Sequence, residues 1–406
     1  MISQHAVESP FAWMRLWTSL ALATLGGIGM WSVVVALPAV QSDFGVARGA
    51  ASLPYTLTMV GFGVGSILMG RVSDRFGIML PVIGSSLLMS AGYFAAAYAP
   101  GLGSYALAQG LMIGVGSAVT FAPLLAHVSL WFDRRRGIAV AICASGNYLA
   151  GTVWPPIVQH FIASDGWRQT YIGIGVFCAV TMVPLAFMLR TPPPLSPANG
   201  GRATGFVPRL ATPLGLSGNA LQALIIIAAI CCCVAMSMPQ VHLVAYCSDL
   251  GYGPARGAQM LSLMLACGIV SRIGFGLICD RIGGLRTLLL GSALQGCALL
   301  LFLPFNGLVS LYLISAMFGL FQGGIVPAYA IIVREYFPAQ EAGSRVGMAM
   351  TASLFGMALG GYMSGAIYDA TGSYHAAFIN GIAFNLINLS IAAWLLRRSL
   401  RRVAFA

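Results

Sequence analysis

Apolar runs of about 20 residues recur along the whole chain, and this pattern restricts its fold more than any other feature. A run of that length crosses the hydrocarbon core of a bilayer as a single helix. The runs are continuous, which favours helices over the alternating strands of a membrane barrel. With 58% hydrophobic and 8% charged residues among 406, the sequence is typical of a polytopic membrane protein.

Glycine, proline and charged clusters divide the apolar runs into twelve predicted transmembrane helices. These are expected at residues 16–40, 52–72, 78–98, 103–130, 137–162, 168–189, 219–247, 257–279, 284–304, 307–333, 342–367 and 375–396. The segment between the sixth and seventh is rich in proline, glycine and serine, as linkers are. The sequence therefore predicts an all-α membrane protein with two six-helix bundles, residues 1–189 and 219–406, and a cytoplasmic linker at 190–218. The first run lacks a small-residue cleavage site, and we interpret it as a span and not as a signal peptide.

All 21 basic residues are arginines, and they are distributed unevenly between the two sides of the predicted membrane. Nearly all, Arg15 included, fall on one side, against Arg48, Arg168 and Arg256 on the other. Only Arg272 remains between the two sides. By the positive-inside rule the crowded side is cytoplasmic, so both termini are expected there. Topology thus explains the net charge of +11, and a nucleic-acid partner is not needed.

Enzyme, metal and cofactor motifs are missing from the sequence. The nine cysteines fall within apolar runs without a Cys-x-x-Cys pair or a nearby histidine set, which indicates buried thiols. No His-Glu-x-x-His, Gly-x-Ser-x-Gly or phosphate-binding glycine loop occurs. We therefore expect neither an enzyme nor a bound cofactor or metal.

The two halves of the chain repeat one another. The segment Gly70–Gly77, Gly-Arg-Val-Ser-Asp-Arg-Phe-Gly, is matched 206 residues later by Gly276–Gly283, Gly-Leu-Ile-Cys-Asp-Arg-Ile-Gly. Three glycines of the fifth predicted helix are likewise matched in the eleventh, 210 residues later. Two matches at nearly one offset indicate duplicated six-helix halves. Carriers built from such repeats bind substrate near the bilayer midplane, at the repeat interface, and work by alternating access.

The paired Gly-x-x-x-Asp-Arg-x-Gly loops, the twelve helices and the central linker resemble the major facilitator superfamily. Four shorter segments resemble the monocarboxylate transporter family, to which oxalate and formate exchangers are related. These segments are Trp131–Gly146, Pro239–Tyr246, Arg272–Gly276 and Asp369–Tyr374. The resemblance implies a carrier of small organic carboxylates in the bacterial inner membrane, and we expect it to function as a monomer.

The sequence departs from this family's pattern at the groups that carry protons. Proton-coupled animal members have an aspartate one helical turn before the arginine, where this chain has Gly268. Their first-helix lysine and the oxalate exchanger's eleventh-helix lysine have no counterpart, because the chain contains no lysine. Anion exchange and proton symport through another group both remain open.

Arg272 is the expected substrate-binding residue. An ionised guanidinium inside a membrane helix costs ~3 kcal/mol or more unless it faces a bundle interior or water. Gly274 and Gly276 beside it favour close packing against another helix. The ten acidic residues all fall in termini, loops or helix ends, so a substrate carboxylate is the expected counter-ion. A guanidinium binds a carboxylate through two parallel hydrogen bonds; the alternatives are structural pairing or an interfacial anchor.

Further candidates are polar or aromatic residues of other predicted helices. His242, which follows Pro239, is the candidate proton carrier or gate, since histidine titrates near neutral pH; the alternative is a packed, hydrogen-bonded histidine. Five residues at mid-depth are predicted to line the substrate pocket: Thr120, Phe121, Asn147, Tyr148 and Gln322.

Two charged pairs are predicted to form a cytoplasmic gate, Asp74 with Arg75 and Asp280 with Arg281. Two other functions remain open. A drug or metabolite exporter of the same superfamily would be expected to have an acidic cavity for cations, and a receptor derived from a carrier would bind without transport.

Overall fold

The computed structural model describes residues 7–192 and 213–404, which form helices, turns and loops without a strand. The chain divides into two compact units, Met1–Gly201 with Gly253–Ser262 and Arg202–Tyr252 with Leu263–Ala406. Of the predicted linker, residues 193–212 lie outside the described part of the chain. The all-α architecture predicted from the apolar runs is confirmed.

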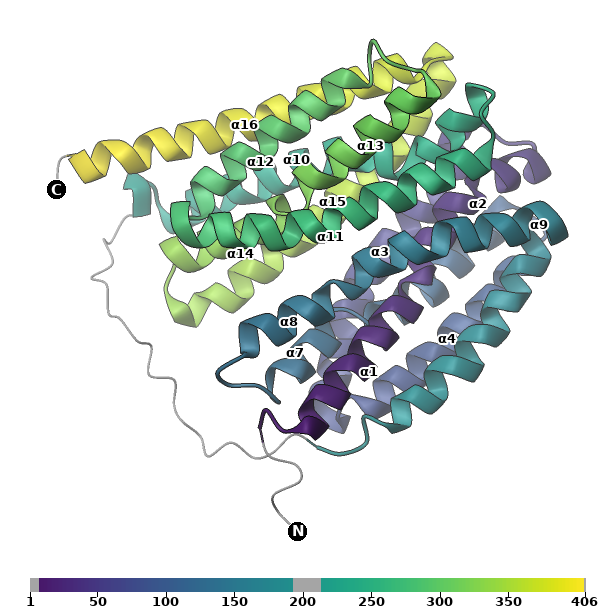
Figure 1. Ribbon diagram of the computed structural model, residues 1–406, viewed down its shortest axis with the longest axis horizontal. Coiled ribbons are helices and arrows are strands. Elements are labelled where there is room, and N and C mark those ends of the chain that lie inside the picture. Colours follow the sequence, from purple (N-terminus) through teal and green to yellow (C-terminus); the bar gives the residue numbers. More distant parts are fainter. Residues whose placement is uncertain (1–6, 193–212, 405–406) are drawn as a thin grey trace. The chain divides into compact units, whose positions relative to one another are not determined.

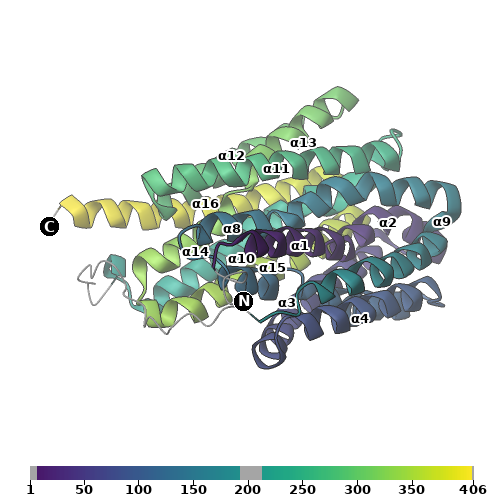
Figure 2. The ribbon, with the colours of Figure 1, turned by 60° about the horizontal axis from the view of Figure 1, so that its bottom comes forward.

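The first unit is built around a long helix that contacts most of its neighbours. Its helices are α1 (Pro10–Gly26), α2 (Ile28–Phe44), α3 (Arg48–Phe76), α4 (Met79–Ala97), α5 (Leu102–Leu107), the π-helix η2 (Ala108–Gly114), α6 (Val115–Ala118), α7 (Ala122–Ser129), α8 (Arg136–Ala144) and α9 (Gly146–Phe187). In this unit α4 packs along α9 (Figure 1). Figure 2 shows α1 leading into α2, with Gly27 between them.

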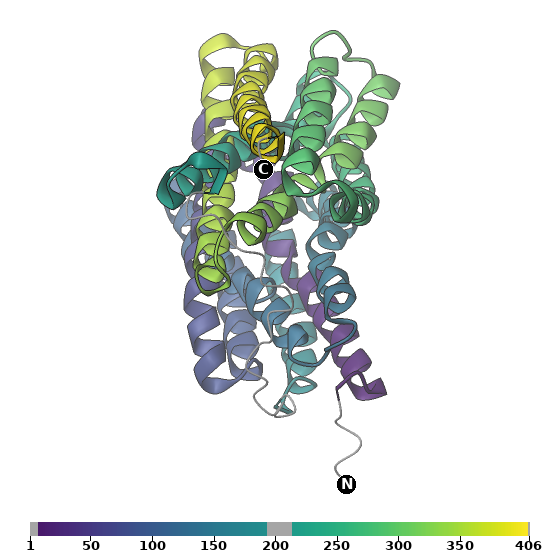
Figure 3. The ribbon, with the colours of Figure 1, turned by 90° about the vertical axis from the view of Figure 1, so that its left-hand side faces the viewer.

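The second unit is built around α10, which packs against α15 and α16. Its helices are α10 (Gly218–Asp249), α11 (Pro254–Ile282), α12 (Gly284–Leu301), α13 (Leu308–Gln322), α14 (Ile325–Tyr336), α15 (Ala339–Thr371) and α16 (Tyr374–Ala404), preceded by the short helix η3 (Pro213–Gly215). Figure 3 looks along α16 from its C-terminal end. Every residue of α10 from Cys231 to Cys247 is buried, so polar side chains there must find partners other than bulk water.

Eleven helical segments of the described chain are long and apolar enough to cross a membrane, where the sequence predicted twelve helices. The difference comes from one segment, Gly137–Phe187, with 51 residues. Its main part, α9, has 42 residues, which as one straight helix would be ~63 Å long, about twice the hydrocarbon thickness. At Gly166 the backbone leaves the helical region, with φ 80° and ψ 161°. The predicted fifth and sixth helices therefore meet at this glycine.

Glycines with positive φ repeat at the offset that the two sequence motifs share. Gly77 ends α3 with φ 76°, and Gly283, 206 residues later, follows α11 with φ 81°. Two further pairs have the same separation: Gly45 with Gly251, and Gly166 with Gly372. Only glycine adopts this backbone region readily, so the turns of one unit recur in the other.

The π-helix marks one extra residue in the first unit. Helices α5 and α13 begin 206 residues apart, as do the contact residues Thr58 and Met264. Gly114 packs against the backbone of Thr58, and Gly319 packs against the backbone of Met264, yet these two glycines are 205 residues apart. The first unit therefore has one more residue before the contact, and the wider turn of the π-helix accommodates it.

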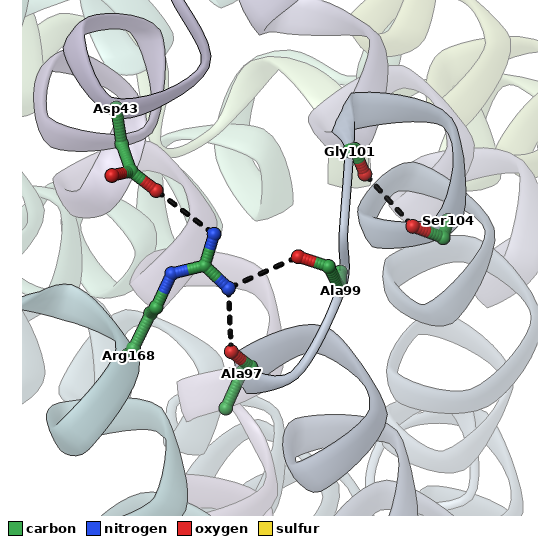
Figure 4. Close-up of polar contacts among 6 residues, drawn as sticks. All are labelled: Asp43, Ala97, Ala99, Gly101, Ser104 and Arg168. Atoms are coloured by element: carbon green, nitrogen blue, oxygen red, sulfur yellow. Dashed lines mark hydrogen bonds and ion pairs between the residues drawn. The ribbon is translucent and has the colours of Figure 1, made fainter.

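An ion pair and two carbonyl contacts hold one end of the first unit together (Figure 4). Arg168 lies just after the Gly166 break, and its Nη2 donates to the Asp43 carboxylate at 2.9 Å. Its Nη1 donates to the carbonyl oxygens of Ala97 and Ala99 at 2.8 and 3.0 Å. The guanidinium thus joins α2, the segment after α4 and the second part of α9.

Candidate functional site

Arg272 lies in α11 and is half-buried. The turn that carries it is in direct contact with the segment after α13, because the Gly323 N–H donates to the Ser271 hydroxyl at 3.1 Å. The prediction that Gly274 and Gly276 provide close packing is wrong. No described group lies within 4 Å of where a Cβ would stand at either position. The close approach is instead made possible by glycines of the partner segment, Gly319, Gly323 and Gly324.

Gln322, one of the predicted pocket residues, is the last residue of α13 and is 1% exposed. Its Oε1 accepts a hydrogen bond from the Nε2 of Gln240 on α10 at 3.0 Å. The structure thus brings Gln322 beside the turn of α11 that carries Arg272. Gln240 is a residue that the sequence-based interpretation missed.

His242 is buried in α10, and its ring connects three helices. Its Nε2 lies 2.8 Å from the Gly361 carbonyl of α15, and its Nδ1 lies 3.0 Å from the Tyr374 hydroxyl of α16. Because a carbonyl only accepts, Nε2 is the donor, and Nδ1 of the neutral ring accepts from Tyr374. His242 therefore lies against α15 and α16, whereas Gln240, two residues earlier, contacts α13.

In the first unit, the predicted pocket residues gather around the break between α1 and α2. A Cβ at Gly26, the last residue of α1, would overlap the side chain of Thr120, so the two are in direct contact. Thr120 is 4% exposed, and its hydroxyl donates to the Ser117 carbonyl at 2.6 Å. Phe121 is half-buried, with its ring centre 6.3 Å from that of Phe62.

Asn147 and Tyr148, near the start of α9, lie at the same break. The Trp31 indole N–H donates to the backbone carbonyl of Asn147 at 3.3 Å, and a Cβ at Gly27 would overlap the following turn of α9. The Asn147 side chain is half-buried and Tyr148 is buried. The structure therefore brings Thr120 and Asn147 to the same part of the first unit.

The four predicted gate residues are exposed at helix ends. Asp74 and Arg75 lie at the C-terminal end of α3, and Asp280 and Arg281 lie at the C-terminal end of α11. The Arg75 guanidinium stacks on the Phe76 ring, 5.2 Å from its centre. Within its own unit, none of the four forms an ion pair with a described residue. Their exposed charges are available to other parts of the protein or to solvent.

A second arginine is buried among the helices, contrary to the expectation that Arg272 alone lies between the two sides. Arg15 of α1 is 1% exposed. Its Nη2 donates to the His127 Nε2 at 2.8 Å and to the Leu189 carbonyl at 3.1 Å, and its Nη1 donates to the Met188 carbonyl at 3.4 Å. The guanidinium stacks on Trp131, 4.4 Å from the ring centre. Both carbonyls lie at the C-terminal end of α9, where a positive charge is stabilised, so the role of Arg15 is structural.

Comparison with known families and proteins gives two consistent results. The sequence matches the family described as Major Facilitator Superfamily over residues 20–315 and again over 275–404. It is also 29% identical to Monocarboxylate transporter 13 of Bos taurus over 338 residues, which are 83% of this chain and 77% of that protein.

Solved structures with the same fold cover nearly the whole chain. A bacterial homologue of the human lysosomal transporter Spinster, in an inward-facing and occupied conformation, has a TM-score of 0.77 at 13% identity over 97% of each chain. The nucleoside transporter NupG has a TM-score of 0.71 at 14% identity, covering 95% of this chain and 99% of its own. At such low identities, these similarities show the fold alone.

Proposed function

Because the chain belongs to the major facilitator superfamily, a family of multi-pass membrane transporters and not of enzymes, we propose that it carries small organic carboxylates by alternating access. The observation that carries this proposal is Arg272, a half-buried guanidinium in an apolar membrane helix. The similarity to Monocarboxylate transporter 13 supports a carboxylate as the substrate class.

In this proposal Arg272 binds the carboxylate, and Gln322 adds a hydrogen bond from a neighbouring position. A planar guanidinium with two parallel N–H groups matches both oxygens of a carboxylate, which a lysine ammonium cannot do. An uncharged amide suits a second oxygen of a small acid because it binds without adding charge. Four residues of the first unit are retained as candidate substrate contacts: Thr120, Phe121, Asn147 and Tyr148.

Coupling is proposed to be anion exchange, or proton symport through His242. The chain has Gly268 where proton-coupled relatives of the resembling family have an aspartate, so a carboxylate one turn before Arg272 does not serve as relay. A positive charge that crosses the membrane without its anion is costly, which favours loaded over empty return. His242 is the residue whose protonation state changes most readily near neutral pH.

We further propose that the protein is a monomer of a bacterial inner membrane with both termini in the cytoplasm. This orientation follows from the distribution of its arginines. The exposed residues Asp74, Arg75, Asp280 and Arg281 are then cytoplasmic and serve as gate residues. Modification of single introduced cysteines by an impermeant thiol reagent would locate these ends, after the exposed native Cys297 has been replaced.

The test is transport by purified protein in liposomes. We expect labelled small carboxylates to be taken up faster when the vesicles contain unlabelled acid. We expect Arg272→Lys to raise the half-saturation concentration ~10- to 150-fold, because it loses a charge-assisted hydrogen bond that contributes about 1.5–3 kcal/mol. Arg256→Lys is the matched control. Arg256 is exposed near the start of the same helix and donates only to Gln259, at 3.3 Å.

Wild-type uptake by the Arg272→Lys protein would contradict the assignment of this residue. Uptake of organic cations without any carboxylate would instead favour the exporter. Binding of carboxylates without net or exchange flux would favour a receptor.

A further inference from the structure

Gln240 and Gln322 form a buried pair of amide side chains, 5% and 1% exposed. The Gln240 Nε2 donates to the Gln322 Oε1 at 3.0 Å, which accounts for one end of the Gln322 amide. At the other end, the Gln322 Nε2 is buried and has no hydrogen-bond partner in the described part of the chain. An amide nitrogen carries two N–H donors, and buried donors in folded proteins are almost always paired. The open nitrogen therefore indicates an acceptor that does not belong to the protein.

The pair lies next to the turn of α11 that carries Arg272. Gln322 is followed directly by Gly323, whose N–H donates to the Ser271 hydroxyl at 3.1 Å. A Cβ at Gly324 would overlap the Phe275 ring, one helical turn further along α11. The amide of Gln322 and the guanidinium of Arg272 are thus each one residue away from the contact between Ser271 and Gly323.

We propose that Gln240 is a positioning residue that fixes which end of the Gln322 amide is offered to the substrate. This inference rests on the proposed carboxylate transport. While Gln240 donates to the Gln322 Oε1, the Gln322 Nε2 points away from Gln240. The guanidinium of Arg272 has no acceptor, so both groups then offer only N–H donors. Such a surface selects carboxylates with a second acceptor oxygen on the neighbouring carbon.

Two small acids distinguish a fixed amide from a free one. Pyruvate and lactate are nearly equal in size, but the oxo oxygen of pyruvate can only accept, whereas the hydroxyl of lactate can accept or donate. Gln240→Met keeps much of the side-chain volume and removes the donor. The Gln322 amide can then turn its oxygen toward the ligand, which serves lactate but not pyruvate. We expect the affinity for pyruvate to fall about three- to ten-fold more than the affinity for lactate, the effect of one hydrogen bond.

Gln222→Met is the matched control for the loss of a buried amide. Gln222 lies on the same helix as Gln240, is also 5% exposed, and donates through its Nε2 to the Arg345 carbonyl at 3.1 Å. We expect this variant to lower the melting temperature about as much as Gln240→Met. The ratio of pyruvate to lactate affinity should stay at its wild-type value, since Gln222 does not touch Gln322 in the structure.

Gln322→Met tests whether Gln240 acts through Gln322. If it does, Gln322→Met alone shifts the ratio, and adding Gln240→Met changes the ratio no further. Affinities are measured by calorimetry on the purified full-length protein, and melting temperatures by intrinsic fluorescence. An unchanged ratio in Gln240→Met, or effects of the two substitutions that multiply, would overturn the inference. A wild-type protein that binds neither acid nor any other carboxylate would overturn the proposed function instead.

Discussion

Replacing Arg15 by alanine should destabilise the first unit by about 3–5 kcal/mol, the range for removing one partner from a buried charged cluster. The guanidinium donates to His127, Met188 and Leu189, and hydrogen bonds to charged groups contribute ~1.5–3 kcal/mol each. Stacking on Trp131 adds up to about 2 kcal/mol. Desolvation of the charge offsets several kcal/mol of this sum. Alanine leaves both carbonyls without their donor.

The assay is thermal unfolding of purified protein in detergent, followed by tryptophan fluorescence. Arg15→Ala should melt well below wild type, and Arg15→Lys should melt in between, because lysine keeps the charge but loses the planar donor set. Arg135→Ala is the control. Its side chain is exposed, and only its backbone N–H binds Glu8, so we expect a change within ~0.5 kcal/mol. Equal melting of Arg15→Ala and Arg135→Ala would refute the structural role of the buried guanidinium.

Two further predictions concern the second unit. His242→Gln keeps a donor and an acceptor; if His242 carries the proton, counterflow should persist while accumulation driven by a pH gradient disappears, and retention of both would exclude that role. Gly323→Ala forces a methyl group against Ser271 and should cost about 1–3 kcal/mol in thermal unfolding, whereas Gly274→Ala, with open space, should be neutral or stabilising. A larger loss from Gly274→Ala would show that the α11 contact is misassigned.

The number and type of the helices could be predicted because hydropathy alone determines which runs cross a bilayer. The predicted boundary between the fifth and sixth helices, residues 162–168, contains Gly166, where α9 breaks. The π-helix could not be predicted, because it depends on comparing the packing of the two units.

Arg15 was missed for a physical reason. The positive-inside rule assigns arginines to a side of the membrane, but it does not distinguish a side chain in water from one that points into the bundle. The sequence did contain a signal, since Arg15 lies between Trp13 and Trp17 in an apolar run, where stacking partners are at hand.

The packing role of glycines was misjudged because it depends on which side of a helix meets its neighbour. On α11 the contact with the α13 segment follows a helical stripe, spaced by four, three and four residues: Met264, Gly268, Ser271 and Phe275. Gly274 and Gly276 lie off this stripe. Gln240 was overlooked for a similar reason, because its importance comes from the α13 residue that it contacts.

The π-helix allows the two units to be aligned position by position with a single gap. With an offset of 206 before the gap and 205 after it, the side chains proposed for carboxylate recognition have smaller or apolar counterparts in the first unit: Arg272 pairs with Ser66, Gln322 with Ser117 and Gln240 with Val34. The backbone is duplicated, but the recognition chemistry is present in one copy. Transplanting it, with Ser66→Arg in an Arg272→Ser chain, would ask whether either half can hold the substrate's charge.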